Sequence, residues 1–173
     1  LASLALSIET FAVWTGWPYS PFSYHPDLAL KLLDTTPLIV GLAWPGVLLS
    51  SWVLTHRFPA RLTRVIFTAL LLVSYDLLLD PVAVNWGIWS WADSGSWYGI
   101  PWQNYAGWLL TGLLGAGVLE LLRSRFKLRL ITQPSSRLLA AQTLLWNTAF
   151  WAGVAAASGW WELVGIGTVL GVV

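Results

Sequence analysis

The 173-residue sequence contains no cysteine and no methionine, and only 10% of its residues are charged. The lack of cysteine excludes disulfide bonds, thiol redox chemistry and cysteine-ligated zinc. A soluble domain usually has about 25% charged residues, whereas hydrophobic residues make up 57% of this chain. This composition is typical of an integral membrane protein. A net charge of +1, without a basic patch rich in aromatic residues, gives no indication of nucleic-acid binding.

Both ends of the sequence lie inside apolar runs, Leu1–Val13 and Leu163–Val173. Together with the missing initiator methionine, these runs lead us to expect that both ends of a longer chain are absent. A signal peptide is the alternative for the first run, but Glu9 interrupts it, and it has neither a basic leader nor a small-residue cleavage site. We therefore expect residues 1–173 to form a single membrane-embedded helical domain that begins with a truncated span.

The apolar runs predict an all-α, polytopic membrane bundle. A membrane-crossing helix needs roughly 20 apolar residues, and proline and glycine mark where such runs end. About six spans are predicted on this basis, of which the terminal ones are partial. They are a first helix to about Trp14, helices over 36–55, 62–79, 105–122 and 138–157, and a last helix from near Trp161. The segments 15–34 and 81–104 are expected to be connections.

The charged residues are divided between the two ends of the predicted bundle. Of nine lysines and arginines, only Lys31 lies outside the connections around 57–64 and 123–137, and the positive-inside rule makes that end cytoplasmic. Of eight acidic residues, only Glu120 lies near the basic end. Acids contribute little to membrane orientation, so their segregation predicts an acidic functional centre in the outer half. Simple avoidance of the basic end is the alternative.

Two aspartates give the sharpest indication of chemistry. Asp76 and Asp80 are four residues apart, which places them on one face of the third predicted helix. An ionised acid at membrane depth costs roughly 2.5–3.5 kcal/mol on insertion scales, so two acids on one face indicate a function. Glu9 maps to a similar depth and is a third candidate acid. Asp80 precedes Pro81, and the alternative is that it only ends the helix.

Aromatic residues are crowded into the connection that follows these aspartates. Seven of them are candidate substrate-binding residues: Trp86, Trp89, Trp91, Tyr98, Trp102, Tyr105 and Trp108. Tryptophan and tyrosine also gather at membrane interfaces, which is the alternative for about half of the tryptophans. The face of an aromatic ring stabilises a nearby cation, so the cluster predicts a pocket for a carbocation or a long polyene. Asn104 is a candidate to fix a water molecule or an acid's proton, with helix capping as its alternative.

No histidine or carboxylate spacing suggests a metal site, and no glycine-rich loop suggests a phosphate-bearing cofactor. His25 and His56 fall in predicted loops on opposite faces, so they are not expected to share a metal ion. We therefore expect neither a metal nor a cofactor.

Three motifs carry a resemblance to a known family. They are Asp76-xxx-Asp80-Pro81, Trp86-Gly87-x-Trp89-x-Trp91 and Tyr98-Gly99-Ile100-Pro101-x-x-Asn104-Tyr105-x-Gly107-Trp108-x-x-Thr111-Gly112. They resemble a bacterial and archaeal family of membrane carotenoid-biosynthesis proteins. Its named members are carotenoid 1,2-hydratases of the γ-carotene 1′,2′-hydratase and bisanhydrobacterioruberin hydratase type. The resemblance spans most of residues 9–112.

The resemblance implies that water is added across the C1–C2 double bond of an acyclic ψ-end group. A carboxylic acid would protonate C2, and water would capture the tertiary cation at C1. The resemblance does not say which acid acts, and we expect Asp80 in preference to Asp76 and Glu9. A neighbouring carboxylate or Asn104 would position that water. The implied substrate is γ-carotene, lycopene or an acyclic C50 precursor. The implied location, in contact with membrane lipid, is a bacterial or archaeal plasma membrane or a photosynthetic membrane. The oligomeric state stays open.

Other functions are compatible with the same residues. A carotenoid (lycopene-type) cyclase would begin with the same protonation, but a carbon–carbon double bond would attack the cation instead of water. A non-catalytic carotenoid-binding or lipid-binding membrane protein, or a proton-coupled transporter, would also use intramembrane acids. Against a transporter, the sequence has no visible repeat symmetry and no paired broken helices. The mass of the product separates the enzymes, because hydration adds water and cyclisation adds nothing.

Overall fold

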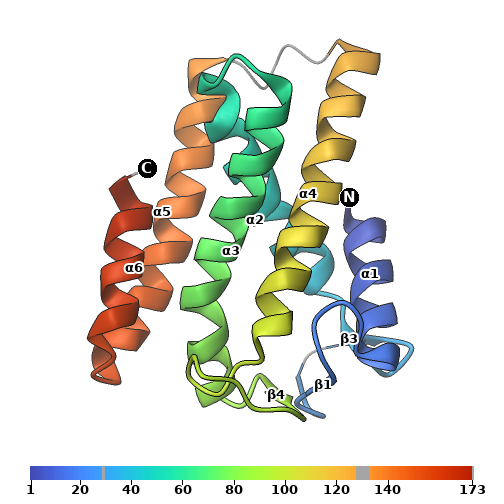
Figure 1. The fold of residues 1–173 in the computed structure, drawn as a ribbon, viewed down its shortest axis with the longest axis vertical. Coiled ribbons are helices and arrows are strands. Elements are labelled where there is room, and N and C mark those ends of the chain that lie inside the picture. Colours follow the sequence, from blue (N-terminus) through green and yellow to red (C-terminus); the bar gives the residue numbers. More distant parts are fainter. Residues whose placement is uncertain (29, 128–132, 173) are drawn as a thin grey trace.

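The computed structural model describes residues 1–28, 30–127 and 133–172, which fold into a bundle of six α-helices. The helices run alternately up and down, and strands β1, β3 and β4 lie together at one end (Figure 1). In chain order, the described elements are α1 (Ala2–Thr15), β1 (Phe22–Tyr24), β2 (Lys31–Leu32), β3 (Thr36–Pro37), α2 (Val40–Leu54), the 3₁₀-helix η1 (Thr55–Arg57), α3 (Arg61–Asn85), β4 (Trp89–Trp91), α4 (Trp102–Phe126), α5 (Pro134–Ala157) and α6 (Trp161–Val172).

The predicted order of helices is confirmed, with differences at their ends. The helix expected over 36–55 begins only at Val40, because Thr36–Pro37 pairs with β2 as a short antiparallel strand. Helices α4 and α5 begin earlier than expected, at Trp102 and Pro134. Proline is well tolerated in the first turn of a helix, where its missing N–H has no helical partner to lose. The proline at the start of α5 therefore opens the helix instead of delaying it.

Helix α3 was expected to end just before Asp80, but it continues through Pro81 to Asn85. A proline inside a helix removes the hydrogen bond to the carbonyl group four residues earlier, which here is that of Leu77. The indole N–H of Trp97 donates to this carbonyl oxygen instead, at 3.1 Å. The tertiary contact satisfies the freed backbone group, so the helix can continue. The alternative that Asp80 only ends a helix is therefore wrong.

The interior of the bundle is filled by aliphatic and tryptophan side chains. Leu48, Trp52 and Leu72 have no exposed surface. Many large apolar side chains are exposed on the outer faces of the helices, including Leu42 and Leu62 at 70% each. Among the described residues, α3 and α4 are the two helices that are long and apolar enough to cross a membrane.

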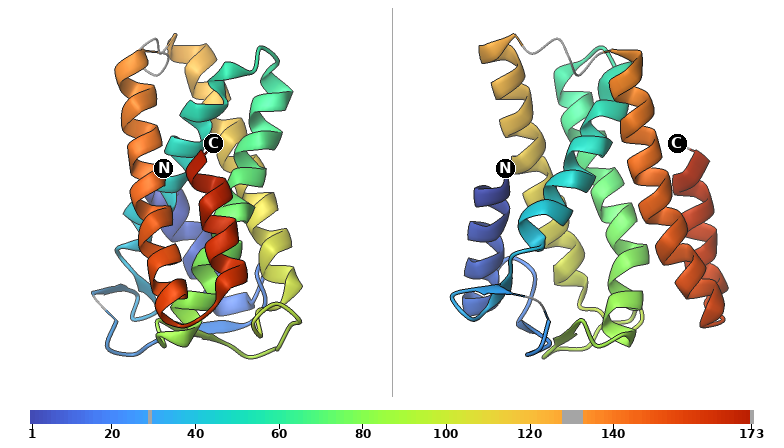
Figure 2. Two further views of the ribbon diagram at one scale, coloured as in Figure 1. Left: turned by 90° about the vertical axis from the view of Figure 1, so that its left-hand side faces the viewer. Right: turned by 180° about the vertical axis from the view of Figure 1, so that it is seen from behind.

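The two ends of the bundle differ in charge. The α2–α3 connection, the end of α4 and the start of α5 lie at one end, and β1 and β4 lie at the other (Figure 1). The basic residues of the described connections therefore gather at one end, as the sequence predicted, whereas Arg129 lies outside the described residues. The short helices α1 and α6 occupy opposite edges of the bundle (Figure 2).

Candidate active site

Two aspartates and one asparagine meet between α3 and α4. The side-chain nitrogen of Asn104 lies 2.7 Å from Asp76 Oδ2 and 2.7 Å from Asp80 Oδ2. An amide nitrogen carries two hydrogens, so one Asn104 can donate to both carboxylates. All three residues are about 1% exposed. The structure therefore places Asp76 and Asp80 inside the protein, on the face of α3 that meets α4, and Asn104 bridges them.

Asp80 receives further hydrogen-bond donors from the aromatic connection. Trp89 Nε1 donates to Asp80 Oδ1 at 2.5 Å. Trp91 follows Trp89 on the same face of β4, because alternate residues of a strand point the same way. Its indole also lies beside Asp80, although its buried N–H does not form a hydrogen bond with acceptable geometry. Both oxygens of Asp80 therefore accept N–H bonds, one from Asn104 and one from Trp89.

Glu9 reaches this group through Tyr24, not by a direct bond. The Tyr24 hydroxyl donates to Glu9 Oε1 at 2.5 Å, and the Tyr24 ring packs edge-on against Trp89 with ring centroids 5.9 Å apart. Burial first, and then the Glu9 carboxylate, raise the pKa of Tyr24 well above its usual value of 10.0, so this tyrosine stays a neutral donor. A chain of contacts thus runs from Glu9 to Asp80.

The strand pair β1–β4 makes this arrangement possible. Tyr24 pairs with Trp89, and Phe22 pairs with Trp91, in an antiparallel register. The pairing joins segments that are far apart in the sequence, and this is why the sequence analysis gave Tyr24 no role at the site. The alternation of aromatic residues at positions 22 and 24 is the one sequence signal that matches it.

The other aromatic candidates are divided between the site and its surroundings. The Tyr105 hydroxyl is buried and interacts electrostatically with both aspartates, whereas Trp108 packs against the central core. Trp86 is half exposed and contacts aromatic rings of α5. Trp102 is 77% exposed. The Tyr98 hydroxyl donates to Glu162 at 3.0 Å, near the start of α6. Trp86, Trp102 and Tyr98 thus lie away from the carboxylates.

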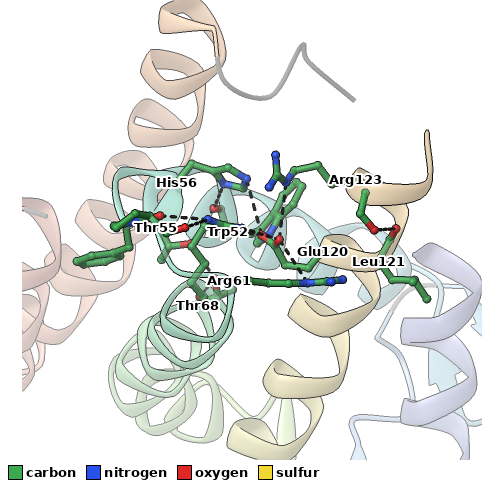
Figure 3. Close-up of polar contacts among 12 residues, drawn as sticks. Trp52, Thr55, His56, Arg61, Thr68, Glu120, Leu121 and Arg123 are labelled. Carbon is green, nitrogen blue, oxygen red and sulfur yellow. Dashed lines mark hydrogen bonds and ion pairs between the residues drawn. The ribbon is translucent and has the colours of Figure 1, made fainter. Parts of the chain in front are cut away.

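A second group of buried charges lies at the basic end of the bundle. Arg64 Nε and Nη2 each donate to the Glu120 carboxylate at 2.8 Å, and Trp52 Nε1 donates to it at 3.0 Å. Arg61 and Arg123 lie 3.8 and 3.7 Å away from it. Figure 3 shows most of these side chains converging on Glu120. The group joins α2, α3 and α4, and it explains the one acid that the charge pattern placed at the basic end.

The fold and the site define a class of protein: a helical bundle in which a buried, amide-bridged pair of carboxylates faces aromatic rings. This arrangement suits proton transfer to an apolar ligand. The chain belongs to the family described as carotenoid biosynthesis protein, whose model it matches over residues 1–173. The predicted family is thereby confirmed.

One relative of the chain has the name of a hydratase. The chain is 37% identical over 117 residues to a bisanhydrobacterioruberin hydratase of Haloarcula japonica, a match that covers 65% of this chain. The match spans only 40% of the length of that relative. No solved structure matches the chain.

Proposed function

We propose that this chain is a membrane-embedded helical domain of a carotenoid hydratase, which adds water across the C1–C2 double bond of an acyclic ψ-end group. The observation that carries this proposal is the buried pair of carboxylates that Asn104 bridges. Acid catalysis on a hydrocarbon needs a carboxylic acid in a dry, apolar wall. Family membership and the name of the archaeal relative support the same reaction.

A membrane location follows from the same argument. The substrate is a hydrocarbon, two helices are long and apolar enough to cross a membrane, and large apolar side chains cover the outer faces of the bundle. The basic end faces the cytoplasm by the positive-inside rule. The carboxylate pair then lies in the outer half of the membrane, at the end of the bundle that holds β1 and β4.

The hydrogen bonds suggest which carboxyl group carries a proton. Two carboxylates this close together in a dry site cannot both ionise, so they share a proton. Both oxygens of Asp80 accept N–H bonds, which stabilise its ionised form. Asp76 Oδ1 has no partner among the described residues, so it is the free position for a proton. Sequence reasoning preferred Asp80 as the proton donor, whereas this geometry favours Asp76.

The reaction then proceeds in two steps. The π electrons of the C1–C2 bond take the proton from Asp76 Oδ1, which forms a C2–H bond and leaves a tertiary cation at C1. The ionised Asp80 and the faces of nearby indole rings stabilise this cation. A water oxygen then bonds to C1, and its proton returns to the Asp76 carboxylate. The acid is regenerated, and the net change is the addition of one water molecule.

Substrate entry requires a movement of the side chains that cover the carboxylates. Asp76 and Asp80 are about 1% exposed. The carboxylates do not line the groove formed by Leu54 and Phe67 or the groove formed by Leu54 and Leu145. The end of a polyene can therefore reach Asp76 only when the side chains around it shift.

Expression of the full-length protein in cells that make lycopene tests the proposal. The expected product is a carotenoid that is heavier by one water for each modified end. Asp76→Asn should lower hydration about 10²–10⁴-fold, the usual contribution of acid–base catalysis. Asp34→Asn is a matched control, because Asp34 is exposed at the same end of the bundle. A product with the mass of the substrate would indicate a cyclase, and unchanged pigment would count against an enzyme.

A further inference from the structure

Three buried polar atoms near the candidate site have no hydrogen-bond partner among the described residues. Two are oxygens, Asp76 Oδ1 and the hydroxyl oxygen of Tyr105, and the third is the indole donor Trp91 Nε1. The other oxygens of the pair are occupied, because Asp76 Oδ2 and both oxygens of Asp80 accept N–H bonds. Tyr105 follows Asn104 directly on α4, and it interacts electrostatically with both aspartates. The two free oxygens therefore lie at the same end of the α3–α4 pair, on either side of Asn104, which bonds Asp76 and precedes Tyr105.

A water molecule is the ligand that these atoms fit. A buried water needs two to four polar partners in a polar site. A tyrosine hydroxyl can accept a hydrogen bond and also donate one, and the protonated Oδ1 of Asp76 can do the same. Buried polar groups are rarely left unpaired, because the loss of hydration is unfavourable. An aromatic ring that served only for stacking would need no hydroxyl group inside the protein.

We propose that Tyr105 and Asp76 Oδ1 form the binding site for the water that attacks the substrate. This inference rests on the proposed hydratase function, and it gives the Tyr105 hydroxyl a task that stacking on the polyene does not need. Tyr105 holds the water oxygen beside C1, and Asp76, having given its proton to C2, accepts a proton from the same water. The bond formed is C1–O and the bond broken is one O–H of water.

The chemistry predicts what happens when the water is missing. Unless a carbon–carbon double bond of the chain attacks it, the cation then loses a proton, either from C2 or from a methyl group on C1, to the Asp76 carboxylate. That step restores an alkene and regenerates the acid. In deuterium oxide the acidic proton is replaced by deuterium, so an enzyme that protonates without hydrating will place deuterium in unhydrated carotene.

The test uses membranes that contain the full-length protein, supplied with lycopene in deuterium oxide. The wild type should form a hydroxylated product with deuterium at C2. Tyr105→Phe keeps the ring and should lower hydration about 10²-fold, the size of effect expected when a reactant loses its positioning, while deuterium still enters the alkene. Tyr98→Phe is the matched control, because its hydroxyl bonds Glu162 away from the site. Asp76→Asn should abolish both exchange and hydration.

Two outcomes would overturn the water site. One is a Tyr105→Phe protein that hydrates at the wild-type rate. The other is a Tyr105→Phe protein with the wild-type melting temperature that loses exchange and hydration together. If the variant is unstable, 3-fluorotyrosine at position 105 preserves the fold while altering the hydroxyl. The ratio of hydration to exchange should then fall, and an unchanged ratio refutes the site. A wild type without hydrated product would instead refute the proposed function.

Discussion

Replacing Arg64 by methionine tests how the bundle holds α3 and α4 together. The substitution keeps an apolar stem of similar length but removes both hydrogen bonds to Glu120. It also removes those to the backbone oxygens of Phe58 and Pro59, at 3.1 and 2.9 Å. Glu120 is 1% exposed, so its carboxylate cannot turn to water. The variant should therefore be markedly less stable than the wild type.

The expected size of this loss follows from the contacts that remain. Removing one partner of a buried ion pair costs about 3–5 kcal/mol. Trp52 still donates to Glu120 at 3.0 Å, and the other two arginines stay within 3.8 Å. These contacts place the loss near the lower end, at about 3 kcal/mol. When Glu120→Leu accompanies Arg64→Met, no unpaired carboxylate remains, and the loss should shrink towards zero.

Equilibrium unfolding of the wild type, Arg64→Met, Glu120→Leu and the double variant in detergent micelles measures these free energies. Arg125→Met is a matched control, because Arg125 is exposed at the same end, and it should change the unfolding free energy by no more than about 0.5 kcal/mol. The reasoning is refuted if the double variant loses as much as the two single variants combined. Additivity of that kind would mean that Arg64 and Glu120 contribute independently.

Four further predictions concern the site, its access, the basic end and the orientation. Asn104→Leu should lower hydration about 10²-fold, because the carboxylates lose the donor that positions them; a wild-type rate would exclude the bridge. Ser23 and Ser90 are exposed and paired across β1 and β4. If this strand pair must open to admit the substrate, a disulfide between cysteines at these two positions should stop turnover until it is reduced. Activity in the oxidised form would exclude such a movement. Burial lowers the pKa of His56 below 6.5, so the unfolded chain binds a proton at a higher pH than the folded protein does. The stability of the fold should therefore decrease as pH drops from about 8 to about 5. In His56→Gln, the melting temperature should depend less on pH over this range. A membrane-impermeant thiol reagent applied to intact cells should label Ser90→Cys and spare Lys127→Cys, and the reverse pattern would invert the topology.

The order of helices could be predicted from the sequence because a sufficiently long apolar run satisfies its backbone hydrogen bonds in a membrane by forming an α-helix. The extension of α3 beyond Pro81 could not. It depends on Trp97, which supplies a donor to the carbonyl oxygen of Leu77 from a separate segment. A local pattern contains no information about such a tertiary hydrogen bond, so proline chemistry alone predicted the wrong end for this helix.

The acids of the candidate site were identified from the sequence, whereas their partners were found only in part. Helical spacing placed Asp76 and Asp80 on one face, and the structure adds the amide that bridges them. The count of aromatic residues could not separate rings at the carboxylates from rings such as Trp102, which is 77% exposed. Composition records how many rings a segment has, while strand pairing decides which of them turn inward.

The position of Asn104 depends on the whole length of the α3–α4 pair. The two helices are antiparallel, and the Arg64–Glu120 ion pair joins them at the basic end. At mid-length, a side chain added at Gly112 would come within 3.1 Å of the Ala69 Cα, so the backbones approach closely there, as small residues permit in membrane helices. The amide bridge follows at the acidic end. A shift of α4 along α3 would break the ion pair and the close contact together, so these two contacts fix the register that brings the amide to both carboxylates.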